Sequence, residues 1–223
     1  MFRRRRGAAE TVAAAPPETE PASPVRESGP WDADEGFPTA ERVDLGGLLL
    51  PIGAGFEVQL QVAGDQIIGA LVLVEESALQ VHAFAAPKRS GIWDEVRAEL
   101  TREVGVAGGT VTEQEGPFGV ELAAKVPQQP GESPQPVRYL GIDGPRWFLR
   151  AVVSGRAAID PAAAEMLENV IKDIVVVRGE EPMAPKEAIA LRLPAEARQA
   201  MEQEPEPEYY NPFERGPEIT EIR

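Results

Sequence analysis

The chain of 223 residues contains one histidine, His82, and no cysteine. The lack of cysteine excludes thiol catalysis, thiolate zinc sites and disulfides. A single histidine also excludes zinc sites with several histidines and iron sites with two. His82 itself is either a general base or an ordinary half-buried strand residue. The residue types therefore predict no metal site, no cofactor and no recognisable catalytic set, so we expect a protein that is not an enzyme.

The most informative segment for binding runs from Asp143 to Val153. If it is a strand, alternation places Arg146, Phe148 and Arg150 on one face. Two guanidinium groups beside an aromatic ring could hold a carboxylate or phosphate and stack on a flat ligand. With His82 they form our candidate ligand-binding site. The alternative is that both arginines pair with acids of the domain, such as Glu121 or Asp173, or extend past a helix.

Two other patterns imitate ligand-binding loops. The segment 53–55, Gly-Ala-Gly, lacks the third glycine and the following helix of a dinucleotide site, and an alternating strand follows it, so we expect a hairpin turn. Asp32, Asp34, Glu35 and Gly36 lack the closing glutamate of a calcium loop, and a proline interrupts them. This acidic group is predicted to be part of a disordered linker.

The two ends of the chain have opposite character. The first residues include Arg3-Arg4-Arg5-Arg6, and the stretch after them is too short and too polar for a signal peptide. This basic tip predicts either a disordered end or a weak contact with an anionic membrane surface or an acidic partner. From residue 179 onward, eleven acidic residues stand against five basic ones. Within that end, Tyr209-Tyr210-Asn211-Pro212-Phe213 is a candidate partner-binding motif; the alternatives are docking on its own domain or disorder.

Composition divides the chain into three parts. Residues 1–38 hold six prolines and no periodic pattern, which predicts a disordered arm. Residues 39–194 are expected to form one domain with its core in 39–178, and 195–223 an acidic, proline-rich tail. The net charge of −15 disfavours binding to nucleic acid. No stretch of about twenty apolar residues predicts a transmembrane segment.

Apolar periodicity predicts the elements of the central domain. Strands are expected over 43–52, 56–62, 67–74, 79–85, 110–114, 119–126, 137–142, 146–153 and 174–177. One helix is expected over 92–104 with Ser90 as its cap. A second begins at Pro161 after the cap Asp160, and its buried stripe includes Met166. These elements predict an α+β domain with a mostly antiparallel sheet and two amphipathic helices covering one face, similar to the Mog-one and PsbP-like sandwich.

Several phrases, in this order, resemble the actinobacterial family called domain of unknown function 3710. They are Val43-Asp44-Leu45-Gly46, Ala83-Phe84-Ala85-Ala86-Pro87, Trp93-Asp94-Glu95-Val96-Arg97, Gly116-Pro117-Phe118-Gly119, the segment 143–150 and Val176-Val177-Arg178-Gly179. The resemblance extends from about Gly29 to Pro194. It implies a cytoplasmic bacterial protein and carries no activity. We therefore expect a non-enzymatic protein-binding or adaptor domain with an unknown protein partner. The alternative is a domain that binds a small anionic metabolite, or a weak enzyme, using the Arg146 and Arg150 strand face.

Overall fold

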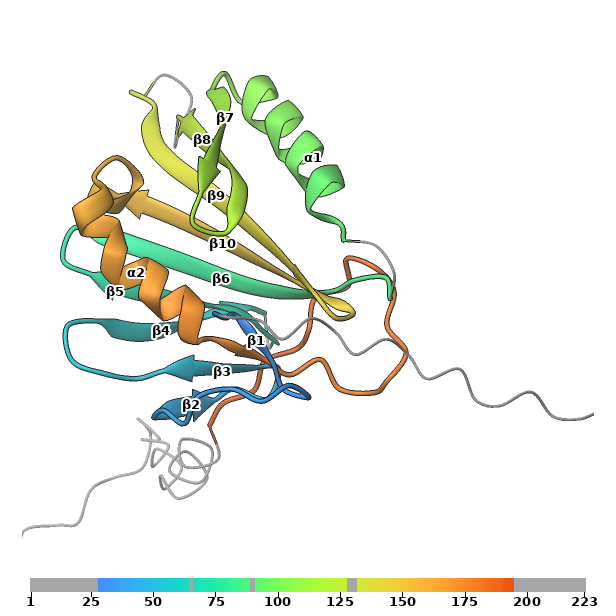
Figure 1. The fold of residues 1–223 in the computed structure, drawn as a ribbon. Helices are drawn as coiled ribbons and strands as arrows, with labels where there is room; N and C mark the ends of the chain where they lie inside the picture. The colour runs from blue at the N-terminus through green and yellow to red at the C-terminus, as the bar shows by residue number, and fades with distance from the viewer. Residues whose placement is uncertain (1–27, 65, 89–90, 128–131, 195–223) are drawn as a thin grey trace, which may run out of the picture.

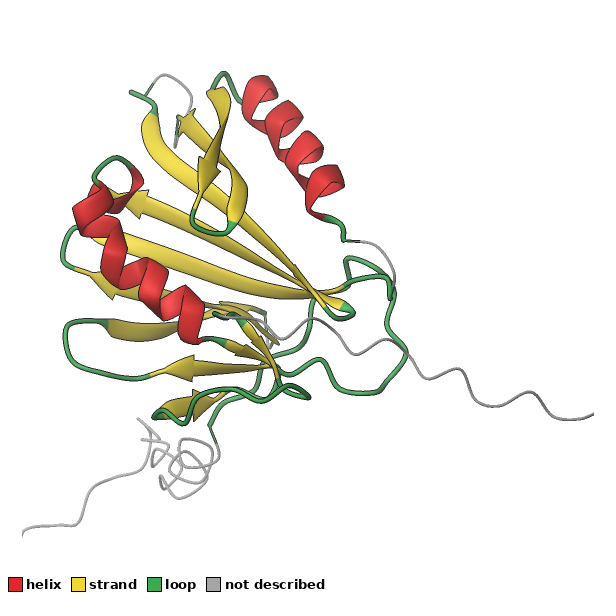
Figure 2. Ribbon diagram, in the orientation of Figure 1, coloured by secondary structure: helices red, strands yellow, loops and turns green. Residues whose placement is uncertain are grey.

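The computed structural model describes residues 28–64, 66–88, 91–127 and 132–194, which form two β-sheets and two α-helices (Figures 1 and 2). The large sheet is antiparallel throughout, in the order β4-β5-β6-β10-β9-β8-β7. Its strands are β4 (Glu57–Ala63), β5 (Gln66–Val74), β6 (Ser77–Ala85), β7 (Thr110–Gly116), β8 (Gly119–Val126), β9 (Gln135–Gly144) and β10 (Trp147–Gly155). The predicted class, a mostly antiparallel α+β fold with two helices, is confirmed.

Two runs of hairpins build the large sheet. β4, β5 and β6 follow one another in the chain, as do β7 to β10, because short turns connect antiparallel neighbours. The runs join where β10 pairs with β6, in a register that sets Arg150 opposite His82 and Phe148 opposite Phe84. Residues far apart in the sequence thereby come to share one face of the sheet.

The small sheet has the order β1-β11-β3-β2, with β1 (Trp31–Asp32), β2 (Arg42–Asp44), β3 (Leu48–Pro51) and β11 (Val175–Val176). The single strand expected over 43–52 is a hairpin instead. Gly46 has a φ of 78°, a conformation that glycine adopts without steric cost, and it helps turn the chain back at this point.

β1 corrects our prediction of a disordered acidic linker around Asp32. This short strand pairs in parallel with β11, and Asp32 is only 5% exposed. The Asp32 carboxylate accepts a 2.6 Å hydrogen bond from the indole Nε1 of Trp147, which is fully buried. A buried indole N–H needs such an acceptor, so ordered structure extends before residue 39.

The small sheet and α2 (Pro161–Asp173) cover one face of the large sheet and enclose the main hydrophobic core. A 3-10 turn, η1 (Arg156–Ala158), leads from β10 into α2. Asp160 caps the helix as predicted, accepting a 3.0 Å hydrogen bond from the Ala162 amide. Met166, which we expected in the buried stripe, is 41% exposed.

α1 (Trp93–Val106) packs on β7, β8 and β9 and forms a second core with Phe148 and Leu122. Phe148 lies between Trp147 and Leu149, and both of these neighbours belong to the main core. Because side chains alternate along a strand, the two helices lie on opposite faces of the large sheet. Our expectation that both helices cover one face is therefore wrong.

Residues 182–193 form a strap that fills a split between β5 and β6. The Ile189 amide donates to the Ala83 carbonyl at 2.9 Å, and the Leu191 amide donates to the Ile67 carbonyl at 3.3 Å. Both strap side chains are buried in the main core. Among the helices that the structure describes, none has the length and apolar character to cross a membrane.

Candidate functional site

Four half-buried side chains form a cluster on the α1 side of the large sheet, next to the helix. We call it the Arg150 cluster; it consists of His82, Phe84, Tyr139 and Arg150. His82 and Phe84 come from the same face of β6, and Arg150 lies directly opposite His82 on β10. The Arg150 guanidinium carbon lies 5.3 Å from the centre of the Phe84 ring, a cation–π distance. Tyr139 is on the adjacent strand β9.

Arg150 has no carboxylate within ion-pair distance in the described part of the chain. Arg178 lacks a carboxylate too, but its guanidinium donates to the carbonyls of Gly179 and Glu181, whereas no hydrogen bond from Arg150 to a described residue is present. Arg42 pairs with Asp173, Arg97 with two acids, and Arg138 with Glu121 at 2.8 Å. In Arg150, by contrast, Nε is buried and has no hydrogen-bond partner among the described residues. Burial also lowers the pKa of this guanidinium, which nevertheless stays charged at neutral pH.

His82 is neutral at physiological pH. Burial, with a further contribution from the positive charge of Arg150, lowers the pKa of the imidazole to about 4. The ring packs against the bare backbone of Gly69, where a Cβ atom would lie 2.8 Å from it. Its Nδ1 atom is buried without a hydrogen-bond partner among the described residues. A cation and an unpaired imidazole nitrogen thus lie side by side.

Two further ionisable groups face Arg150. Burial raises the pKa of the Tyr139 phenol, so it remains a neutral donor at neutral pH. The exposed carboxylate of Glu103, on α1, acts on Arg150 and Tyr139 electrostatically but lies beyond ion-pair distance of the guanidinium. Water therefore screens the negative charge nearest to Arg150.

An aromatic row joins the Arg150 cluster to α1. The ring of Phe84 lies 6.2 Å from that of Phe148, and Phe148 lies 5.9 Å from Trp93 at the start of the helix. Trp93 lies on Gly141 of β9, where a Cβ would overlap its ring, and its Nε1 donates to the Val120 carbonyl at 2.7 Å. This row fixes one wall of the cluster.

Asp143 holds the start of α1 in place. Its carboxylate accepts from the Ile92 amide at 2.8 Å and from the Trp93 amide at 3.3 Å. Asp143 lies in the β9–β10 hairpin, so the cap reaches α1 from a distant strand rather than from its own sequence. The local cap we predicted, Ser90, lies outside the described residues.

Our candidate ligand-binding residues end up in different places. His82 and Arg150 face each other, as the site requires. Phe148 is on the same face but only 1% exposed beneath Trp93, so it supports the cluster rather than contacting solvent. Arg146 does not lie on the strand face with Phe148 and Arg150 as we expected. It occupies the turn before β10, with a φ of 61°.

The alternative partners that we considered for the arginines are already used. Glu121 is 2% exposed and accepts two hydrogen bonds from Arg138, which also bonds Glu168 on α2. Asp173 pairs with Arg42. The two acids do bind arginines, but not Arg146 or Arg150, so that alternative is wrong for both named acids.

Sequence reasoning missed Phe84 and Tyr139. Phe84 could have been predicted from the sequence, because it follows His82 by two positions on an alternating strand and so lies on the same face. Tyr139 required the register of the β9–β10 hairpin, which pairs it with Val152. The candidate partner motif Tyr209–Phe213 lies outside the described residues. Within the described ranges no group of three or more acidic or histidine side chains could hold a metal ion.

Comparisons with known proteins add a family and little else. The sequence model of a family described as "Protein of unknown function (DUF3710)" matches residues 29–200. No curated protein matches the chain. The chain is similar to the solution structure of cyanobacterial PsbP (CyanoP) from Synechocystis, with 11% sequence identity and a TM-score of 0.40. That match covers 66% of this chain and 99% of the other, and so distant a likeness supports no argument about function.

Proposed function

Because the chain belongs to the family described as a protein of unknown function, DUF3710, which brings no activity with it, we propose a function from the site alone. The protein is a non-catalytic binding domain whose Arg150 cluster holds the carboxylate or phosphate group of a small ligand. Arg150 supplies the charge, Tyr139 and His82 supply polar groups beside it, and Phe84 orients the guanidinium.

One observation supports this proposal above the others: Arg150 is half-buried and lacks a carboxylate partner, whereas Arg42, Arg97 and Arg138 each have one. Removing a guanidinium from water without an anion is costly, and the cost is offset when an anion binds. A planar guanidinium can bind carboxylate or phosphate oxygens through two parallel hydrogen bonds.

The protein-binding function that we predicted from Tyr209–Phe213 stays a prediction, since those residues lie outside the described part. The same applies to the cytoplasmic, actinobacterial setting and to the contact of Arg3–Arg6 with a membrane surface. None of them conflicts with a small-ligand site. An adaptor that binds its partner only when a ligand occupies the Arg150 cluster would combine both functions.

The single histidine makes the proposal directly testable by NMR, because the chain gives one set of imidazole signals. We would titrate the protein with benzoate, phosphate and the neutral analogue benzamide. Benzoate and phosphate are expected to shift the His82 signals to saturation. They should also raise the pKa of the imidazole, because a bound anion offsets the charge of Arg150. Benzamide should do neither. A ligand at about 100 times its dissociation constant should also stabilise the fold by about 2.7 kcal/mol.

The matched variants are Arg150→Met and Arg102→Met. Arg102 is an exposed arginine of α1, so its loss changes the net charge equally without touching the cluster. Binding should disappear in Arg150→Met and persist in Arg102→Met. If no anion shifts the His82 signals, or if both variants lose binding alike, the Arg150 cluster is not an anion site.

A further inference from the structure

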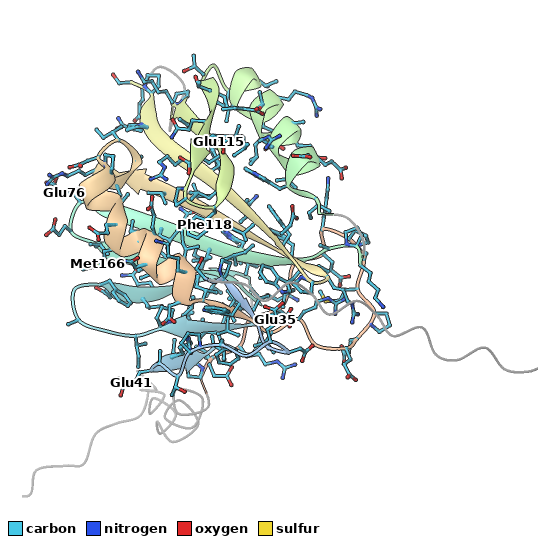
Figure 3. All side chains as sticks on the ribbon, viewed as in Figure 1. Glu35, Glu41, Glu76, Glu115, Phe118 and Met166 are labelled. Atoms are coloured by element: carbon cyan, nitrogen blue, oxygen red, sulfur yellow. The ribbon has the colours of Figure 1, made fainter. Side chains whose placement is uncertain are left out.

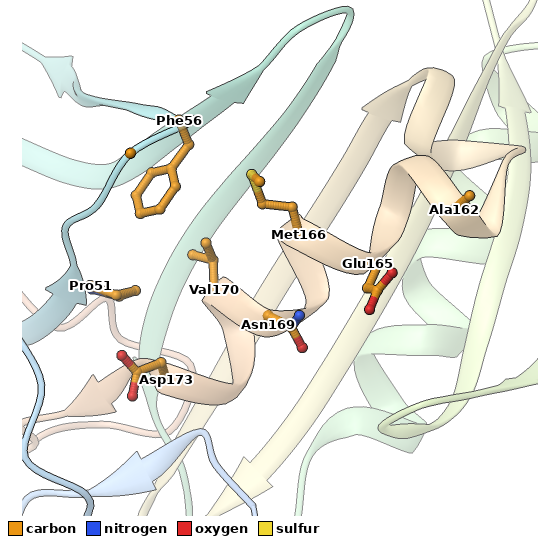
Figure 4. Close-up of a pocket in the computed structure, with 9 residues that line it drawn as sticks. Pro51, Phe56, Ala162, Glu165, Met166, Asn169, Val170 and Asp173 are labelled. Carbon is orange, nitrogen blue, oxygen red and sulfur yellow. The ribbon is translucent and has the colours of Figure 1, made fainter.

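An apolar groove of about 530 Å³ runs along α2 on the other face of the large sheet (Figure 4). Met166 and Val170 line it from the helix, and Pro51 and Phe56 line it from the facing β3–β4 segment. In Figure 4 the Phe56 ring faces these helix side chains across the groove. Met166 is 41% exposed, and Ile52 next to the groove is 48% exposed. Large exposed apolar side chains gathered around one groove mark a binding surface.

Two acidic side chains line this groove, and a third lies on the residue that hydrogen-bonds Ile52. Glu165 and Asp173 line it, and Glu41 is exposed nearby, with its carbonyl accepting from the Ile52 amide at 3.1 Å (Figure 3). Asp173 is engaged by Arg42, but Glu41 and Glu165 have no cation partner among the described residues. The groove therefore suits an occupant that is both apolar and positively charged.

The N-terminal part of the chain leaves the described region at one end of the groove. Gly29 lies against the last turn of α2, where a Cβ atom on it would overlap the Lys172 carbonyl oxygen. Asp173, the next residue, lines the groove. Residues 1–27 therefore connect to the domain beside this surface.

Those residues contain the one segment of the chain with the required chemistry. Phe2 is followed at once by Arg3-Arg4-Arg5-Arg6. The 21 residues between Arg6 and Ser28 are long enough to span up to about 70 Å, and α2 is about 20 Å long. The arginine segment can thus reach any point of the groove from its attachment at Gly29.

We propose that residues 1–6 dock in the α2 groove, with Phe2 among Met166, Phe56 and Val170 and the arginines against Glu41 and Glu165. The contact lies on the opposite side of the large sheet from Arg150 and stands independently of the function proposed above. It assigns the basic tip of the chain an intramolecular partner, in place of a membrane surface.

Because the chain has no cysteine, a single Ala8→Cys substitution allows a nitroxide label at one site. In full-length protein, the label is expected to broaden the NMR signals of the Met166 methyl group and of amides around Gly55 and Val170. High salt should reduce the broadening, because it screens ion pairs at the surface. The same signals should recover in a variant in which Arg3 to Arg6 are replaced by serine.

A charge-reversed groove, Glu41→Lys with Glu165→Lys, should abolish the broadening. The matched control is Glu115→Lys on β7 with Glu132→Lys in the loop before β9. Both residues are exposed and neither has an ion-pair partner among the described residues, so this variant should leave the broadening unchanged. All of these positions are on the surface, so thermal unfolding should confirm that each variant folds. Three results would overturn the proposal: no broadening at the groove, equal loss in both double variants, or equal broadening of isotope-labelled protein without nitroxide when nitroxide-labelled protein is added to it. The last result would indicate a second copy as the occupant.

Discussion

At the scale of single residues, Arg150 and Arg138 make a natural comparison. Both are strand arginines with limited exposure, but Arg138 has two acids and Arg150 has none among the described residues. Replacing Arg138 by methionine leaves the carboxylates of Glu121 and Glu168 without their cation, and Glu121 is buried. The free energy of unfolding should fall by about 3–5 kcal/mol. Arg150→Met removes an unpaired buried charge and should leave stability unchanged or raise it. Urea unfolding of both variants checks this contrast. Equal losses would mean that Arg150 has a structural role.

His82 should make stability depend on pH in a defined window. Its pKa is about 4 in the folded protein, below the ordinary value of 6.5, so the unfolded chain binds a proton that the folded protein does not. Above about pH 6.5 the group therefore has no effect. As pH falls from 6.5 to 4, the folded state loses stability. For a half-exposed ring, screened by water, the loss is on the order of 1–2 kcal/mol. Between pH 6.5 and 4, the free energy of unfolding of His82→Gln should fall by this much less than that of the unsubstituted protein. Parallel curves for the two proteins would contradict a depressed pKa.

At the scale of elements, α1 and α2 begin with different caps. Asp160 caps α2 from the adjacent position, whereas Asp143 caps α1 from a distant hairpin. Replacing either aspartate by alanine should lower the free energy of unfolding by about 1–2 kcal/mol. Hydrogen exchange should separate them: Asp143→Ala is expected to speed exchange in α1 alone, and Asp160→Ala in α2 alone. Unchanged exchange in α1 after Asp143→Ala would mean that the aromatic row holds this helix without its cap.

The same contrast between local and distant contacts separates the features that the sequence predicts from those that it does not. The alternating strand that became β4 and the Asp160-Pro161 start of α2 depend on neighbours in the chain, so their patterns were readable. β1 is only two residues long, and it depends on β11 and on the indole of Trp147. Arg150 and His82 were identified one by one. Their meeting required the register between β6 and β10, which no local pattern encodes. Met166 matched the helical period of the core, but it lies on the side of α2 that lines the groove and is 41% exposed.

At the scale of the whole molecule, the strap over 182–193 bridges β5 and β6 at the end of their hairpin where the two strands do not pair. It fills the gap between β5 and β6, and Lys186 contacts Glu99 and Glu95 of α1 at 2.7 Å and 3.0 Å. Its buried side chains, Ile189 and Leu191, lie in the main core. The strap therefore stabilises the fold through apolar burial, while the exposed ion pairs of Lys186 contribute little.

A chain ending after Pro194 should accordingly unfold at the same urea concentration as the full chain, and a chain ending after Glu181 should not form a stable fold. Because the shorter chain removes many contacts at once, point variants give the sharper test. Ile189→Ala should cost about 2–5 kcal/mol, as for other buried aliphatic side chains. Lys186→Ala should cost less than about 1 kcal/mol. The reverse order would mean that the ion pairs to α1, rather than the buried strap residues, hold the strap in place.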